Sequence, residues 1–163
     1  MIETVPDSWT TFPCPRRATI NDLPDIAEVH RLAFFGAMPG MPVLHTRAED
    51  LNFYSTTVFA RSEIWLHELT GAVAGFIAFH PGWVDHLYIH PQHQRRGLGS
   101  SLLALAQASS DSLSLWTFQC NAGARCFYEK HGFSIERETD GTGNEENQPD
   151  ILYHWERHCA ARG

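Results

Sequence analysis

The chain has 163 residues, enough for one domain with a substantial core, because a domain of this size buries about 70% of its unfolded surface. Its 12 basic and 19 acidic residues give a net charge of −7, which argues against a nucleic-acid partner, since such a partner favours a basic face. No stretch approaches the roughly 20 apolar residues of a membrane span. We therefore expect a single cytoplasmic domain over residues 1–163, with residues 1–15 as an irregular N-terminal arm.

Hydrophobic periodicity and turn residues predict eleven elements in the order β-α-α-β-β-β-α-β-α-β-β. Their expected ranges are 16–20, 22–35, 46–59, 63–69, 72–79, 83–90, 100–108, 113–118, 122–131, 133–138 and 150–157.

Two connections in this order decide the sheet. Tight turns join the three strands between 63 and 90, which predicts an antiparallel meander. A helix joins the strand at 83–90 to that at 113–118, so a right-handed crossover should make this pair parallel. The apolar loop 36–42 is either the rim of a pocket or a tight connection packed on the core.

A glycine-bearing loop, Gln94-Arg95-Arg96-Gly97-Leu98-Gly99, follows the strand at 83–90 and opens the next helix. The first N–H groups of a helix lack partners within it, and the helix dipole favours negative charge there. Because glycine has no Cβ, a diphosphate can approach this backbone closely. On these six residues alone, a plain helix start explains the loop equally well.

A second stretch, 121–133, reads Asn-Ala-Gly-Ala-Arg-Cys-Phe-Tyr-Glu-Lys-His-Gly-Phe. It is similar to the N-x-x-A-x-x-F-Y-E-K-x-G-F segment of the GNAT N-acetyltransferase superfamily. The spacing Gln-x-x-Gly-x-Gly between a strand and a helix resembles the acetyl-CoA motif of the same family. The two motifs stand in the family's order, and the predicted elements over residues 16–157 match its element order.

The resemblance implies a mixed α/β (α+β) fold with a mostly antiparallel sheet, whose parallel central strands splay apart to admit acetyl-CoA. Backbone amides of the glycine loop would hold the diphosphate, and the exposed strand edge would pair with the pantetheine arm. The cofactor-binding residues implied are Leu87, Tyr88, Ile89, Gln94, Arg95, Arg96, Gly97, Leu98, Gly99, Ser100, Asn121 and Phe127.

The resemblance also places Tyr128 beside the thioester sulfur as the acid. A phenol with a pKa of about 10 stays protonated at neutral pH, whereas a departing thiolate with a pKa of about 8.5 needs a proton. Without the resemblance, a core tyrosine packed between Phe127 and Phe133 is the favoured interpretation.

Asp85 is the candidate base. Strict alternation puts it on one strand face with Leu87 and Ile89, and turns His86 to the other face unless a bulge intervenes. A hydrogen-bonded carboxylate at the strand end explains Asp85 about equally well, and a water chain could remove the proton instead.

The activity implied is direct attack by a primary amine of a small molecule or peptide on acetyl-CoA. No nucleic-acid or membrane partner is expected, and a homodimer is left open. A non-catalytic acyl-CoA sensor with the same fold is the alternative, and a transferase of another acyl group, such as succinyl, is a third hypothesis. The acceptor and the acyl chain are not readable from the sequence.

Histidine and cysteine contribute no predicted metal site. His80, His86, His90 and His93 are close in sequence, but strand and loop geometry scatters them and no spaced Cys or His pair completes a zinc set. The four cysteines are expected to be reduced thiols, with Cys126 packed in the core.

Overall fold

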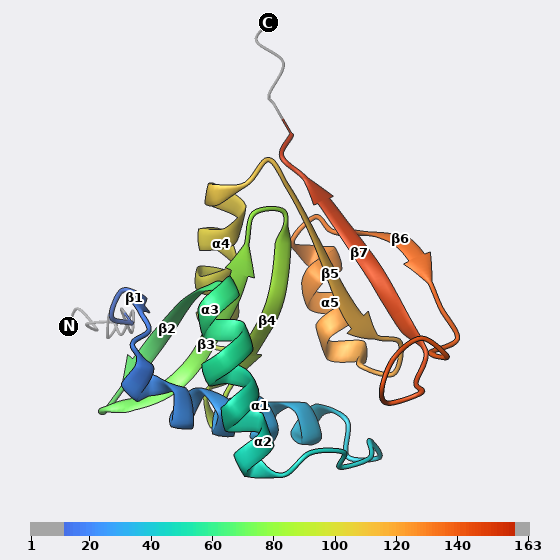
Figure 1. Cartoon of the computed structure of the whole chain (residues 1–163). Coiled ribbons are helices and arrows are strands. Elements are labelled where there is room, and N and C mark those ends of the chain that lie inside the picture. The colour runs from blue at the N-terminus through green and yellow to red at the C-terminus, as the bar shows by residue number, and fades with distance from the viewer. Residues whose placement is uncertain (1–11, 159–163) are drawn as a thin grey trace, which may run out of the picture.

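The computed structural model describes residues 12–158, so most of the predicted N-terminal arm, and Cys159, lie outside the described residues. A seven-stranded sheet organises the fold in the order β1-β2-β3-β4-β5-β7-β6 (Figure 1). Its strands are β1 (Arg16–Arg17), β2 (Glu63–Leu69), β3 (Ala72–His80), β4 (Trp83–Ile89), β5 (Ser112–Phe118), β6 (Ser134–Glu138) and β7 (Asp150–Glu156). Neighbouring strands are antiparallel except for the parallel pair β4 and β5.

Helices pack on both faces of the sheet. They are η1 (Ile20–Asp22), α1 (Leu23–Ala37), α2 (Arg47–Phe53), η2 (Tyr54–Val58), α3 (Phe59–Arg61), η3 (Pro91–His93), α4 (Leu98–Ser109) and α5 (Ala122–Lys130). On one face, α1 and η2 bury Ile26 and Tyr54 against Phe76 of β3. On the other, α4 and α5 cover residues from both halves of the sheet, with Leu102 and Tyr153 fully buried.

The predicted order of elements is confirmed, and two elements differ in detail. The first strand stops at Arg17, because the chain turns into the short helix η1. The expected helix over 46–59 contains a π-helical segment, η2, in which the hydroxyls of Ser55 and Thr56 donate to carbonyls four residues earlier, both at 2.8 Å. Such side-chain bonds compete with the regular helical ladder, which favours a local change in pitch.

Strands β4 and β5 meet at one end only. Trp83 and Ser114 form the single registered Cα pair between them, and the Ser114 N–H donates to the Gly82 carbonyl at 2.8 Å. From there β4 stays paired with β3 as far as Ile89, while β5 stays paired with β7 as far as Phe118. The predicted splay of the parallel pair is therefore confirmed, and it separates the sheet into two wings (Figure 1).

Within residues 12–158, no helix has the length and apolar character needed to cross a bilayer. In the same range, Cys14, Cys120 and Cys126 are exposed free thiols. The predicted core position of Cys126 is therefore wrong: α5 presents this residue on its outer side, away from the buried Tyr128.

Candidate functional site

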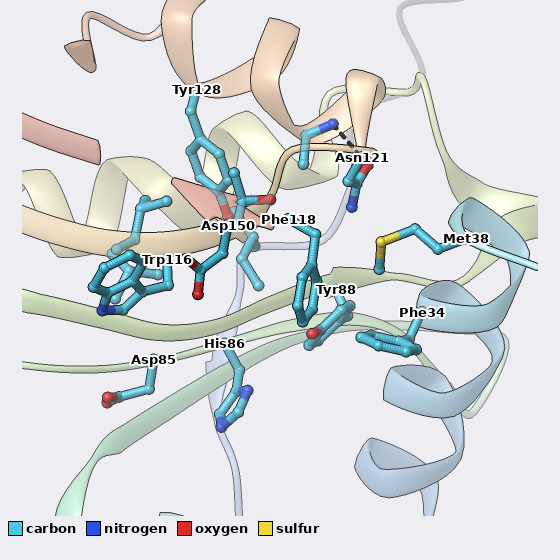
Figure 2. Close-up of a pocket in the computed structure, with 15 residues that line it drawn as sticks. Phe34, Met38, Asp85, His86, Tyr88, Trp116, Phe118, Asn121, Tyr128 and Asp150 are labelled. Atoms are coloured by element: carbon cyan, nitrogen blue, oxygen red, sulfur yellow. Dashed lines mark hydrogen bonds between the residues drawn. The ribbon is translucent and has the colours of Figure 1, made fainter. Parts of the chain in front are cut away.

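The opening between β4 and β5 is a cavity into which side chains from α1, β4, β5, α5 and β7 project (Figure 2). Five of the residues predicted for the site line this cavity. They are Asp85, Leu87, Tyr88, Asn121 and Tyr128. Residues that the sequence did not single out complete the lining, most prominently Phe34, His86, Trp116, Phe118 and Asp150.

Tyr128 enters the cavity from α5 (Figure 2). The residue is 8% exposed, and among the described residues no hydrogen bond to its hydroxyl is found. Burial, reinforced by the nearby Tyr88, raises the pKa of this phenol above its ordinary value. The hydroxyl therefore stays protonated at neutral pH and is free to donate a hydrogen bond into the cavity.

The predicted shared face of Asp85 with Leu87 and Ile89 is wrong, because β4 contains a bulge. His86 lies opposite Ala78 of β3, but the next β3 residue lies opposite Val84, so Asp85 is the extra residue. Leu87 and Ile89 pack towards the α4 and α5 side of the sheet.

Asp85 instead makes two hydrogen bonds through one carboxylate oxygen. Ser62 Oγ donates to it at 2.8 Å, and His80 Nδ1 lies 2.7 Å from it. Its neighbour His86 lies on the same sheet side as α1 and lines the cavity (Figure 2). Among the described residues, no hydrogen bond contributes to the pKa of His86.

A group of rings surrounds His86 on this side. The His30 ring of α1 stacks on Tyr88, with ring centroids 4.3 Å apart. Its Nδ1 forms a hydrogen bond of 2.9 Å with the Tyr54 hydroxyl. The His86 ring lies 5.7 Å from that of His30 and 5.4 Å from that of Tyr54. Burial is the main cause that lowers the pKa of His30 to about 3 and that of His86 to about 4, so both imidazoles are uncharged at neutral pH.

The glycine loop lies between η3 and α4 and does not line the cavity itself. Arg95 and Gly97 have positive φ angles of 61° and 86°, which curl the backbone before the helix. Within the described residues, the backbone N–H groups of 95–100 have no hydrogen-bond acceptor. The Gln94 side-chain amide fastens the loop to the end of β4 by donating to the Ile89 carbonyl at 3.1 Å.

The side chains of this loop differ in whether they are available to contact a ligand. Leu98 is 1% exposed, so only its backbone can contact a ligand. Arg96 lies 2.9 Å from His93 Nδ1, whereas Arg95 has no side-chain partner among residues 12–158. Ser100 Oγ lies 2.9 Å from His131 Nε2, a contact between the first turn of α4 and the end of α5.

Two further predicted residues lie on α5 or at its start. Asn121 caps the helix, since its Oδ1 accepts the Ala124 N–H at 3.1 Å, and its amide nitrogen is directed towards the cavity (Figure 2). Phe127 packs outside the cavity, against His131 at 4.3 Å between ring centroids and beside Gly99. The sheet splay thus brings Asn121 and Tyr128 together with β4, while Phe127, Ile89 and the loop form a neighbouring region.

The residues that the sequence analysis missed come from segments with no motif. Phe34 and His30 are four residues apart on α1, a spacing that places both on one helix side, but this signal alone does not distinguish a site from a core face. Asp150 begins β7, where it accepts hydrogen bonds from Thr139 and from Asn144 Nδ2, the latter at 2.9 Å. Among the described residues, no group of His, Cys, Asp and Glu is arranged to hold a metal ion.

Comparison with known proteins agrees with this geometry. Residues 60–135 match the family model described as an acetyltransferase (GNAT) domain. A probable N-acetyltransferase of Mycobacterium tuberculosis is 35% identical over 85 residues, covering 47% of this chain and 49% of the relative. The peptidyl-lysine N-acetyltransferase YiaC of Escherichia coli is 26% identical over 121 residues, covering 74% of this chain and 82% of YiaC.

The chain spans about half the length of the mycobacterial relative and of a second curated relative from E. coli. Among solved structures, the PaiA N-acetyltransferase of Thermoplasma acidophilum in complex with coenzyme A superposes with a TM-score of 0.69 at 18% identity, covering 88% of this chain and 98% of that one. This similarity supports the assignment of the fold.

The two uncharged histidines predict an acid-sensitive fold. In the unfolded chain both titrate near pH 6.5. Because their folded pKa values are about 3 for His30 and about 4 for His86, the unfolded chain binds more protons below about pH 6.5, and the free energy of unfolding falls as the pH drops towards 4. Urea unfolding over this range should show a shallower pH slope for His86→Gln, by up to about 1.4 kcal/mol per pH unit.

The exposed His158 supplies the control, since His158→Gln should leave the slope as in the unchanged protein. An unchanged slope in His86→Gln would show that His86 is not held neutral by burial.

Proposed function

Because this chain belongs to the GNAT superfamily of N-acetyltransferases, we propose that it transfers the acetyl group of acetyl-CoA to a primary amine of a small molecule or a peptide by direct attack. The observation that carries the proposal is the cavity between β4 and β5, which Tyr128 lines together with residues of both strands. When bound, acetyl-CoA supplies an activated acyl group as a thioester. The exposed thiols in the described part of the chain fit a reducing compartment, so we place the reaction in the cytoplasm.

The residues present fit such a ligand. The N–H groups of 95–100 would receive the diphosphate, since they have no acceptor of their own within the described chain and the α4 dipole favours an anion there. Arg95 and Arg96 would add positive charge. Gln94 and Gly97 shape the turn, Leu98 contributes through its backbone, and Gly99 and Ser100 belong to the first turn of α4.

The pantetheine arm would follow the free edge of β4. Leu87, Tyr88 and Ile89 lie beyond the last registered pair with β5, so their backbone groups on this edge can bond to the amides of an extended chain. The Asn121 amide nitrogen would donate to the same arm from the opposite side of the opening. Phe127, beside Gly99, would support the arm from α5 by packing.

Tyr128 would protonate the leaving sulfur. Burial keeps its hydroxyl protonated, and a phenol without a partner among residues 12–158 can direct its proton to the thiolate as the C–S bond breaks. The proton is replaced from the solvent-connected cavity at the end of each cycle.

Asp85 is our proposal for the group that takes the proton from the amine. It lines the cavity, and its contact with the half-exposed His80 offers the proton a route to the surface. His86 lines the same cavity and is the competing acceptor.

Calorimetry with acetyl-CoA and a thiol-release assay over alkylamines, polyamines, amino acids and peptides together test the function. We expect saturable binding of acetyl-CoA and release of CoA with at least one amine class. Binding without turnover over the whole panel would favour the non-catalytic sensor instead. Absence of binding at high micromolar acetyl-CoA would refute both.

Tyr128→Phe should lower kcat by about 10²-fold or more, because it removes only the proton donor. The dissociation constant of acetyl-CoA should stay within about twofold, since the ring and its packing remain. Stopped assays and calorimetry on the same preparation provide both values. Unchanged turnover would remove Tyr128 from the mechanism.

Asp85→Asn and His86→Gln separate the two proton acceptors. If Asp85 is the base, Asp85→Asn should lower kcat/KM by about 10²-fold and remove the fall of kcat/KM at acidic pH. His86→Gln should then lower kcat/KM by a smaller factor. The pH profile of kcat/KM from acid to alkaline pH measures both effects. The reverse ranking would transfer the role to His86, and equal, small effects would point to water.

A further inference from the structure

The segment just before β1 lies against the glycine loop, which is distant from it in sequence. The Phe12 ring lies over the guanidinium of Arg96, whose central carbon is 5.0 Å from the ring centroid. Such stacking is favourable, because the face of an aromatic ring carries partial negative charge. The described end of the predicted irregular arm therefore contacts a residue of the predicted cofactor loop.

A buried histidine fastens this segment to the start of α4. His67 of β2 is 2% exposed, its Nδ1 lies 3.1 Å from the Pro13 carbonyl, and its Nε2 lies 3.0 Å from Ser101 Oγ. A carbonyl can only accept, so Nδ1 carries the proton and donates it. Burial lowers the pKa of His67, so the ring is uncharged at neutral pH and Nε2 accepts the Ser101 hydroxyl. Since the Ser101 N–H donates to the Gly97 carbonyl at 3.1 Å, the backbone next to Phe12 is connected to the turn that begins α4.

A second uncharged group, His93, also holds the guanidinium of Arg96. One guanidinium nitrogen, Nη1, lies 2.9 Å from His93 Nδ1. Because a guanidinium only donates, Nδ1 must be the acceptor, and the proton of His93 is on Nε2. Partial burial, the charge of Arg96 and the nearby His90 all lower the pKa of His93, which keeps its ring neutral and able to accept.

Neither partner neutralises the charge of Arg96. Among residues 12–158, no carboxylate lies within ion-pair distance of its guanidinium, although the residue is exposed. Five other arginines do have such a carboxylate partner: Arg16, Arg17, Arg31, Arg47 and Arg157. Arg96 is thus an ordered cation in a loop whose N–H groups also lack acceptors in the described chain. Because the side chain is already ordered, an anion that binds it loses less conformational entropy.

We propose that Phe12 and His93 position Arg96 as a preorganised cation for a phosphoryl group of the cofactor, so that the segment before β1 completes the phosphate site. The inference rests on the proposed use of acetyl-CoA. Phe12 and His93 are positioning residues, since they act through Arg96 rather than on the ligand. The phosphoryl group is either the diphosphate or the 3′-phosphate of CoA, which share the chemistry that a guanidinium recognises.

A double-mutant cycle on CoA binding, measured by calorimetry at low ionic strength, tests the proposal. Phe12→Leu keeps apolar volume but removes the aromatic face, so it should raise the dissociation constant of CoA by about three- to fivefold, as expected for an exposed cation–π contact. Phe12→Trp restores an aromatic face and should bind CoA as tightly as the unchanged protein.

Arg96→Gln should itself weaken CoA binding by about tenfold, because it removes a charged donor. In this background Phe12→Leu should have no further effect, since the cation that the ring supports is absent. An equal loss from Phe12→Leu in both backgrounds would overturn the proposal, because the ring would then act through the fold rather than through Arg96.

Phe59→Leu is the matched control, since Phe59 is also an aromatic residue at the surface but belongs to α3. It should leave the dissociation constant of CoA unchanged, and a loss equal to that of Phe12→Leu would overturn the assignment. The same cycle with 3′-dephospho-CoA identifies the phosphoryl group. A retained effect of Phe12→Leu assigns Arg96 to the diphosphate, and its disappearance assigns Arg96 to the 3′-phosphate.

NMR of the arginine side chains separates this inference from the proposed function. The Arg96 Nε–H signal is identified by its absence in Arg96→Gln, and in the free protein the Phe12 ring should displace it from the position that Phe12→Leu gives. CoA and inorganic diphosphate should each move this signal in the unchanged protein. If CoA binds without moving it, the inference fails and the proposed function stands. If diphosphate moves it while no amine is acetylated, the inference stands and the proposed transfer fails.

Discussion

The parting of β4 from β5 is the constraint on which the rest of the molecule depends. Each strand is paired along its other side, β4 with β3 apart from the bulge at Asp85 and β5 with β7, so neither can shift to close the opening without giving up these ladder hydrogen bonds. A single core cluster spans both wings behind the opening, with α4 and α5 packed against it. Close packing there fixes the angle between the wings, because side chains at native density do not yield to small displacements.

An open edge between two wings is costly unless a ligand or water satisfies its backbone groups. Polar side chains from both wings accordingly line this opening. Tyr128 projects into the opening from one wing, and Tyr88 and His86 line the opening from the other. Burial holds all three uncharged, since it raises the pKa of the phenols and lowers that of the imidazole. An ammonium that enters therefore meets rings and lone pairs rather than a positive charge.

How far the sequence predicts this arrangement depends on the range of the interaction involved. The strand, glycine loop and helix around Gly97 follow from local periodicity and from a residue that tolerates positive φ, and both were predictable. The position of Asp85 was not, because its bulge depends on the register with β3, a pairing between distant segments. The contact of Phe34 with Phe118 was equally hidden, since it forms only when the fold brings α1 opposite the end of β5.

Asn121 has two structural roles, as the cap of α5 and as a residue that lines the opening. Serine, threonine and aspartate cap helices about as well as asparagine does, since each offers an oxygen to the free N–H groups of the first turn. Only asparagine among these also carries an amide NH₂, and here the oxygen is committed to Ala124 while the nitrogen is directed into the opening. One side chain thus begins α5, which carries Tyr128, and presents a donor to the same cavity. The cap of the helix that carries Tyr128, our proposed acid, and a donor at the opening are consequently supplied by a single residue.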